Sequence, residues 1–96
     1  MILEHVELHI LPCQSEAFEQ AMQQAKNLIA EMPGFLSLQL LKHHQLADRY
    51  LLCIQWQRIE DHQQGFRASA QYQQWKALLH HFYPMERKTS SFRVRI

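Results

Sequence analysis

The sequence predicts an α+β domain with the ferredoxin-like element order β-α-β-β-α-β and an antiparallel sheet. Two observations predict this fold. Apolar and polar residues alternate in four separate segments, as in half-buried strands, and apolar residues recur every three or four positions in others, as in amphipathic helices. The chain has 96 residues, and we expect residues 1–96 to form a single domain because two would not fit in that length.

The first strand and the first helix occupy the N-terminal third of the sequence. Residues 2–11 alternate in polarity, which predicts a half-buried strand, and Pro12 ends it. A helix is expected to begin at Ser15, with Glu16 in the first turn where a negative charge is favourable. The expected buried stripe of this helix is Phe18, Ala21, Ala25, Leu28, Ile29 and Met32. A Pro-Gly pair at residues 33–34 ends it.

The remaining elements follow in order along the chain. Alternation predicts a second strand near residues 35–43 and a third strand at 49–57. A short helix is expected near residues 58–65, and a longer amphipathic helix near 69–82. The tail, residues 90–96, alternates again and is expected to form the last strand.

The two faces of the predicted sheet differ in polarity. Helices must cover the face that carries the apolar even-numbered residues of the first strand. In the second strand, the residues that share one face are Leu36, Leu38 and Leu40. The opposite face of the sheet holds Leu3, Leu11, Leu41, Leu51 and Cys53 among His5, His9, Ser37, Gln39 and Gln55. That mixture is too apolar for water and too polar for a monomer core, so we expect a homodimer that packs sheet against sheet.

Composition and charge exclude several classes of function. The net charge is +1 with acidic and basic residues mixed along the chain, so no field is expected for a nucleic acid or an anionic membrane. The longest apolar runs are far below the roughly 20 residues that a membrane span needs. Cys13 and Cys53 have no metal or redox spacing. Without a recognisable signal peptide, we expect a cytoplasmic protein with reduced thiols.

Several segments, in order along the chain, carry a resemblance to a known family. They are Ile2-Leu3-Glu4, Phe18, Met32-Pro33-Gly34-Phe35-Leu36, Arg49-Tyr50-Leu51-Leu52, Trp56, His62, Gly65-Phe66-Arg67, Ser69, Tyr72, Trp75, Leu78-Leu79-His80 and Phe82-Tyr83. From residue 2 to about residue 84, this joint pattern resembles the antibiotic biosynthesis monooxygenase (ABM) domains. The resemblance implies a dimeric α+β barrel that places a substrate between helices and sheet.

The resemblance also implies a class of function. Some members of the family oxidise phenols or quinols with molecular oxygen and use neither metal nor flavin, whereas others bind and degrade haem. We therefore expect a cofactor-independent monooxygenase that oxidises a small aromatic phenol or quinol with O2. The alternative is a non-catalytic dimer of the same fold that binds a small molecule or haem.

The sequence departs from the family pattern at two places. Haem-degrading relatives use an asparagine on the first strand, and a tryptophan and a histidine after the third strand. Val6 takes the asparagine position, Phe66 takes the tryptophan position, and the histidine position falls near Trp75 or Lys76, so that triad is absent. Residues 85–88, Met-Glu-Arg-Lys, replace a proline- and aromatic-rich segment that would form one wall of the pocket.

His62 is the leading candidate for a catalytic base. It lies three residues from Ile59 and four from Phe66 on the short helix, which turns it toward the interior. An imidazole there can remove a phenolic proton near neutral pH. The alternative is a half-buried histidine that a backbone carbonyl satisfies.

Five further residues are expected to meet the substrate. Tyr72 and Trp75 share one helical stripe and are expected to orient an aromatic ring through their hydroxyl and N–H groups, while Phe66 and Leu79 exclude water. Core packing is the alternative for this stripe. Glu4 lies where an apolar residue would be expected, so it either polarises a substrate hydroxyl or reaches water or an arginine at the strand end.

The other histidines have no expected role in catalysis. His5, Glu7 and His9 share a face, but alternate residues of a strand stand roughly 6–7 Å apart, so one metal ion could not reach all three and no metal site is expected. His80 and His81 fall more than about 120° from the centre of the apolar stripe. Both are expected to face solvent or a dimer partner.

Overall fold

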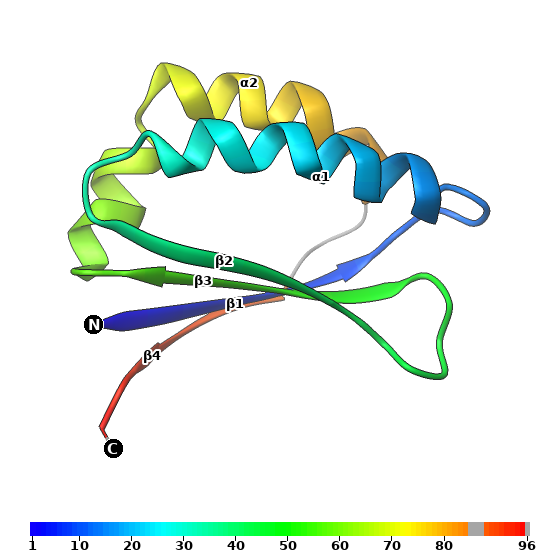
Figure 1. The fold of residues 1–96 in the computed structure, drawn as a ribbon, viewed down its shortest axis with the longest axis horizontal. Helices are drawn as coiled ribbons and strands as arrows, with labels where there is room; N and C mark the ends of the chain where they lie inside the picture. Colours follow the sequence, from blue (N-terminus) through cyan, green and yellow to red (C-terminus); the bar gives the residue numbers. More distant parts are fainter. Residues whose placement is uncertain (85–87, 96) are drawn as a thin grey trace.

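The computed structural model describes residues 1–84 and 88–95 and shows two helices packed on one face of a four-stranded antiparallel sheet (Figure 1). The elements are β1 (Ile2–His9), α1 (Ser15–Ala30), β2 (Phe35–Lys42), β3 (Arg49–Trp56), the π-helical turn η1 (Asp61–Phe66), α2 (Ala70–Leu79), the 3-10 turn η2 (His80–Phe82) and β4 (Lys88–Arg93). The strand order is β2-β3-β1-β4. The predicted ferredoxin-like α+β fold is therefore confirmed. Of the expected pocket wall at residues 85–88, residues 85–87 lie outside the described residues.

Helix α1 buries most of the apolar stripe that the sequence predicts. Its buried side chains are Phe18, Ala25, Ile29 and also Met22, which the predicted stripe did not include. Ala21 and Leu28, with Met32 just after the helix, pack partly against the same core. The hydroxyl of Ser15, at the start of the helix, donates a hydrogen bond to Asp48 Oδ1 at 3.1 Å, which ties this end of α1 to the turn before β3. Figure 1 shows α1 and α2 side by side over the same face of the sheet.

The core between α1 and the sheet is built on aromatic rings. Phe18 has no exposed surface, and its ring centre lies 5.1 Å from that of Tyr50 and 5.8 Å from that of Phe82, both in edge-to-face geometry. The Tyr50 hydroxyl donates a hydrogen bond to Glu19 at 2.5 Å. Burial, together with this hydrogen bond, raises the pKa of Tyr50, so the hydroxyl stays protonated and fastens β3 to α1.

Strand β2 contains an irregularity that the sequence pattern did not reveal. Phe35 pairs with Trp56 of β3, whereas Ser37 pairs with the adjacent Gln55, so Leu36 is left without a partner. The prediction that Leu36 faces the helices with the later leucines is wrong, since 43% of its surface is exposed. An extra residue in one strand of a pair breaks the alternation of faces at that point.

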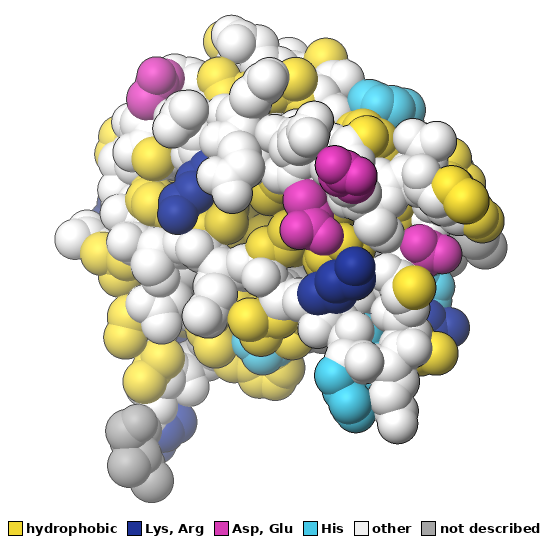
Figure 2. All heavy atoms as spheres, turned by 45° about the vertical axis from the view of Figure 1, so that its right-hand side comes forward, with side chains coloured by type: hydrophobic (Ala, Val, Ile, Leu, Met, Phe, Trp, Pro, Cys, Tyr) yellow, Lys and Arg dark blue, Asp and Glu magenta, His cyan; other side chains and the backbone are white. Residues whose placement is uncertain are grey.

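The sheet face opposite the helices carries the mixture of side chains that the sequence predicts. Phe92 is 50% exposed and Leu41 is 42% exposed, and the ring of Phe92 packs against His5 with ring centres 5.1 Å apart. Cys53 on the same face is half-buried, and burial raises the pKa of its thiol. Figure 2 shows apolar side chains reaching the surface along the lower part of the molecule, where the sheet lies. Within the described residues, no helix has the length and apolarity needed to cross a membrane.

We expect Gly34→Ala to destabilise the fold. Gly34 has a φ of +84°, a conformation that costs a residue with a Cβ about 1–2 kcal/mol. A Cβ there would also collide with the carboxyl group of Asp61, the first residue of η1. That carboxyl group accepts a hydrogen bond from the Arg58 backbone N–H at 3.1 Å. The measurement is the free energy of unfolding in urea, and we expect it to fall by more than about 1 kcal/mol.

Gly65→Ala is the matched control for this prediction. Gly65 lies within η1, and a Cβ there would meet only the Glu60 carbonyl oxygen at an ordinary 3.8 Å. Its free energy of unfolding should stay unchanged or rise slightly, because alanine restricts the unfolded chain. Equal losses in the two variants would show that the backbone at Gly34 is not the cause.

Candidate functional site

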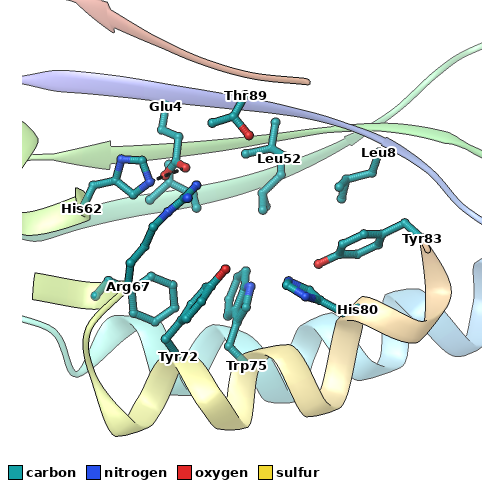
Figure 3. A pocket seen from close by; sticks show the side chains of 13 residues that line it. Glu4, Leu8, Leu52, His62, Arg67, Tyr72, Trp75, His80, Tyr83 and Thr89 are labelled. Atoms are coloured by element: carbon teal, nitrogen blue, oxygen red, sulfur yellow. Dashed lines mark ion pairs between the residues drawn. The ribbon is translucent and has the colours of Figure 1, made fainter. Parts of the chain in front are cut away.

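A small cavity lies between the sheet and the segment that runs from η1 through α2 (Figure 3). The side chains that line it are Glu4, Val6, Leu8, Leu52, Ile54, His62, Phe66, Arg67, Tyr72, Trp75, His80, Tyr83 and Thr89. The volume open to the centre of a water molecule is about 40 Å³. Arg67 and Thr89 are exposed and Tyr72 and His80 are half-buried, whereas the rest are buried, so these four residues form the mouth.

Strands β1 and β3 supply the floor of the cavity. Alternate residues of β1 face the helices, and the antiparallel register places Val6 opposite Leu52 and Glu4 opposite Ile54. The floor is therefore apolar except at Glu4. From Glu4 to Leu8 it extends roughly 13 Å, at about 3.3 Å per residue. One end of an apolar slot thus carries a carboxylate.

The Glu4 carboxylate is buried and has two partners. Its side chain is about 95% buried, Trp56 Nε1 donates a hydrogen bond to Oε1 at 3.2 Å, and His62 Nε2 lies 2.8 Å from Oε2. A buried carboxylate is costly unless it is paired, and these contacts offset that cost. Glu4 therefore faces the cavity and does not reach water or an arginine at the strand end.

His62 faces the interior, in the position expected of it. It is 4% exposed, and its ring stacks on Trp56 with ring centres 6.1 Å apart and planes 20° apart. The contact with Glu4 is short, yet neither ring nitrogen has a hydrogen bond of good geometry with a described residue. The buried imidazole therefore keeps the capacity to bond to a ligand and to exchange a proton with it.

Aromatic side chains of η1 and α2 form the roof. The Phe66 ring meets Tyr72 at 5.1 Å and Trp75 at 5.5 Å, both edge to face. Ser69 fixes this arrangement, since its hydroxyl donates to the Phe66 carbonyl at 2.6 Å and accepts from the Tyr72 N–H at 3.1 Å as the N-cap of α2. The structure thus brings Phe66, Tyr72 and Trp75 together beside His62, and Figure 3 shows the polar atoms of Tyr72 and Trp75 directed toward the sheet.

Two expectations about α2 and η2 differ from the structure. Leu79, expected to help exclude water from the substrate, has no exposed surface and lies in the core, outside the set of lining residues. His80, expected to face solvent or a partner, is half-buried and lines the cavity, with its ring 6.2 Å from that of Tyr72. The reason is that α2 ends at Leu79 and the chain continues as a 3-10 turn, where rotation per residue is no longer 100°. His81 is exposed, as expected.

The sequence reasoning missed three of the four residues at the mouth of the cavity. Thr89 could have been found from strand alternation, because it pairs with the inward-facing Val6. His80 could not be found from helical spacing, because α2 ends one residue before it. Arg67 directly follows η1 and gave no periodic signal, because it belongs to neither helical stripe.

Without rearrangement, the cavity is too small for haem, as it is for a benzene ring. A cavity of roughly 150 Å³ holds a benzene molecule, and about 40 Å³ is open here, whereas a porphyrin is several times larger than benzene. His62, the buried histidine of the site, also has its Nε2 beside Glu4. Within residues 1–84 and 88–95, no three His, Cys, Asp or Glu side chains are grouped as a metal ion would require.

Comparison with known sequences identifies relatives. A sequence model of the family described as "Antibiotic biosynthesis monooxygenase" matches residues 1–78. The uncharacterized protein YczJ of Bacillus subtilis (strain 168) is 43% identical over 83 residues, an alignment that covers 86% of this chain and 87% of YczJ.

Comparison with solved structures shows the same fold. A candidate antibiotic biosynthesis monooxygenase from Bordetella bronchiseptica superposes with a TM-score of 0.94 at 23% identity, over 99% of this chain and 97% of its own. SnoaB from Streptomyces nogalater, described as a cofactor-independent oxygenase, gives 0.84 at 16% identity, over 99% of this chain and 93% of its own.

Proposed function

Because the chain belongs to the antibiotic biosynthesis monooxygenase family, we propose that it oxidises a small phenol or quinol with molecular oxygen, without a metal or flavin. The observation that carries the proposal is the buried contact between His62 and Glu4 at one end of an aromatic-roofed cavity. A proton acceptor inside an apolar slot is what a substrate hydroxyl needs in order to ionise there. The likeness to a cofactor-independent oxygenase supports the same chemistry.

The proton is taken up by the Glu4–His62 pair. Nε2 and Oε2 stand 2.8 Å apart, so His62 can accept the proton of a substrate hydroxyl while the Glu4 carboxylate faces the imidazolium that forms. The substrate anion then transfers an electron to O2, and the resulting radical and superoxide combine to a peroxide. The pair returns its proton to the peroxide, and the O–O bond then breaks together with the C–H bond of the same carbon, so that water leaves and a carbonyl group remains. One oxygen atom enters the product and the other enters water, and the substrate supplies both electrons.

The aromatic roof orients the substrate ring. Phe66 and Trp75 pack edge to face. The ring surfaces that they turn toward the cavity can hold a flat substrate ring against the apolar floor. The Tyr72 hydroxyl and the Trp75 N–H, both directed toward the sheet (Figure 3), can hydrogen-bond a second oxygen of the ligand. Leu79 acts only by packing behind this wall.

The cavity volume favours a second candidate function. About 40 Å³ holds water but not an aromatic ring, so a substrate has to displace the side chains at the mouth. A smaller molecule would fit the cavity without that movement. The second candidate is therefore a protein that binds such a molecule and performs no chemistry. It would bind ligand tightly and consume no oxygen with any quinol.

An oxygen electrode distinguishes the two candidates. Hydroquinones and polycyclic phenols are screened with the purified protein in the presence of a metal chelator. We expect saturable oxygen uptake above the uncatalysed rate for at least one of them, with one O2 consumed per substrate. Binding of these compounds without any uptake would support the binding protein and refute the oxygenase.

We also propose that two copies of the chain pack their sheets together. Leu41 and Phe92 are exposed on the face opposite the helices, and an exposed apolar face of this kind favours association. Light scattering at micromolar concentration should give twice the chain mass of 11.5 kDa. Phe92→Glu should lower that mass toward the monomer, because it would bury a charge in the interface.

Leu46→Glu is the matched control for the assembly. Leu46 is 44% exposed but lies in the turn between β2 and β3, away from the sheet face. This variant should keep the mass of the wild-type protein. A wild-type monomer, or equal masses for both variants, would contradict the proposed dimer.

A further inference from the structure

Arg67 is the only arginine or lysine among the described residues that line the cavity. It directly follows η1, and its backbone N–H donates to the carbonyl of His62 at 3.3 Å, so the base and the guanidinium leave the same helical turn. Its side chain is exposed and lies at the mouth. Figure 3 shows this side chain running from the helical side toward the sheet, on the side of the cavity where Glu4 and His62 are drawn.

The guanidinium has no carboxylate partner in the part of the chain that the structure describes. Residues 1–84 and 88–95 hold no ion pair that involves Arg67, whereas Arg58, nine residues earlier, pairs with Asp61 at 3.5 Å. A guanidinium carries a permanent charge and binds oxyanions with two parallel N–H donors. Its position at the mouth leaves these donors for an anion inside the cavity.

The balance of charges in the cavity indicates which anion Arg67 binds. With a Glu4 carboxylate and a neutral imidazole, the negative charge of the pair is balanced by Arg67. When the substrate proton moves to His62, the pair becomes a neutral imidazolium–carboxylate, and the substrate carries the negative charge. Arg67 then faces that charge, so proton transfer leaves the net charge of the cavity unchanged. Charge separation inside a poorly solvated cavity is otherwise costly.

We propose that Arg67 binds the oxyanion formed when the substrate hydroxyl ionises, and thereby selects ligands that carry an acidic phenolic hydroxyl. This inference rests on the proposed function only in placing the substrate in the same cavity. The charge passes to oxygen in the following step, and the guanidinium is in position to stabilise that charge as well.

4-Nitrophenol tests the inference without turnover, because its ionised form is yellow and its neutral form is nearly colourless. The dye is titrated with protein across a range of pH values. Binding to the wild-type protein should lower the apparent pKa of the dye by about one unit, a tenfold change in its ionisation constant. Arg67→Gln should remove most of that shift, and Arg67→Lys should keep part of it.

Arg58→Gln is the matched control, since it removes the same charge from the same segment without touching the cavity. This variant should lower the apparent pKa of the dye by as much as the wild-type protein does. Dye bound in its neutral form, an unchanged shift in Arg67→Gln, or no saturable binding at all would overturn the inference. If the pKa of the dye shifts in an Arg67-dependent way but the screen of hydroquinones and phenols gives no oxygen uptake, the oxygenase is refuted and the oxyanion site still stands.

Discussion

Replacing His62 with alanine is expected to lower kcat by about 100-fold or more, since a positioned general base contributes 10²–10⁴-fold. His62 is 4% exposed and its Nε2 lies 2.8 Å from Glu4, so its loss removes the imidazole from the buried end of the cavity. The measurement is the rate of oxygen uptake with the best quinol from the screen. KM should change much less than kcat, because the ring is held by the aromatic roof.

His62→Gln separates catalysis from folding in this experiment. Glutamine offers an N–H donor to Glu4 but cannot take up a proton, whereas alanine leaves that carboxylate with Trp56 as its one partner among the described residues. The glutamine variant should be as slow as the alanine variant but more stable to heat. If either variant keeps the wild-type rate, His62 is not the base.

Leu79→Ala should lower the free energy of unfolding by about 2–5 kcal/mol. Leu79 has no exposed surface and fills the core between α2 and the sheet, so truncation removes apolar contacts and leaves a cavity. Urea unfolding at one fixed protein concentration measures the loss. The folded variant should keep oxygen uptake within a few-fold, because Leu79 does not line the cavity.

Leu46→Ala makes the same chemical change at an exposed position. Leu46 is 44% exposed in the turn before β3, and its truncation should change the free energy of unfolding by no more than about 0.5 kcal/mol. If Leu79→Ala loses more activity than its loss of stability explains, Leu79 contacts the substrate.

The periodic parts of the chain were predictable from the sequence. The alternation of β1 and the stripe of α1 depend on local spacing, and the structure reproduces both, with Phe18 and Ile29 fully buried. His62 was also predictable, because its neighbours three and four residues away are apolar. Leu36 was not, since the bulge in β2 depends on how Phe35 and Ser37 pair with another strand.

The contacts that make the site required the tertiary structure. Glu4 and Trp56 are 52 residues apart, and their hydrogen bond follows from the register of β1 on β3. That Glu4 is inward could be read from alternation, but its partners could not. Arg67 and Thr89 meet at one cavity mouth only because β4 returns beside β1. No local pattern brings these two residues together.

The most direct test of the central claim is a crystal structure with a hydroquinone bound under anaerobic conditions. The account predicts the ring between the aromatic roof and the apolar floor, with one ligand oxygen about 2.6–3.2 Å from His62 Nε2 or Glu4 Oε2. A ligand bound elsewhere, or a cavity that stays closed at saturating ligand, would contradict it.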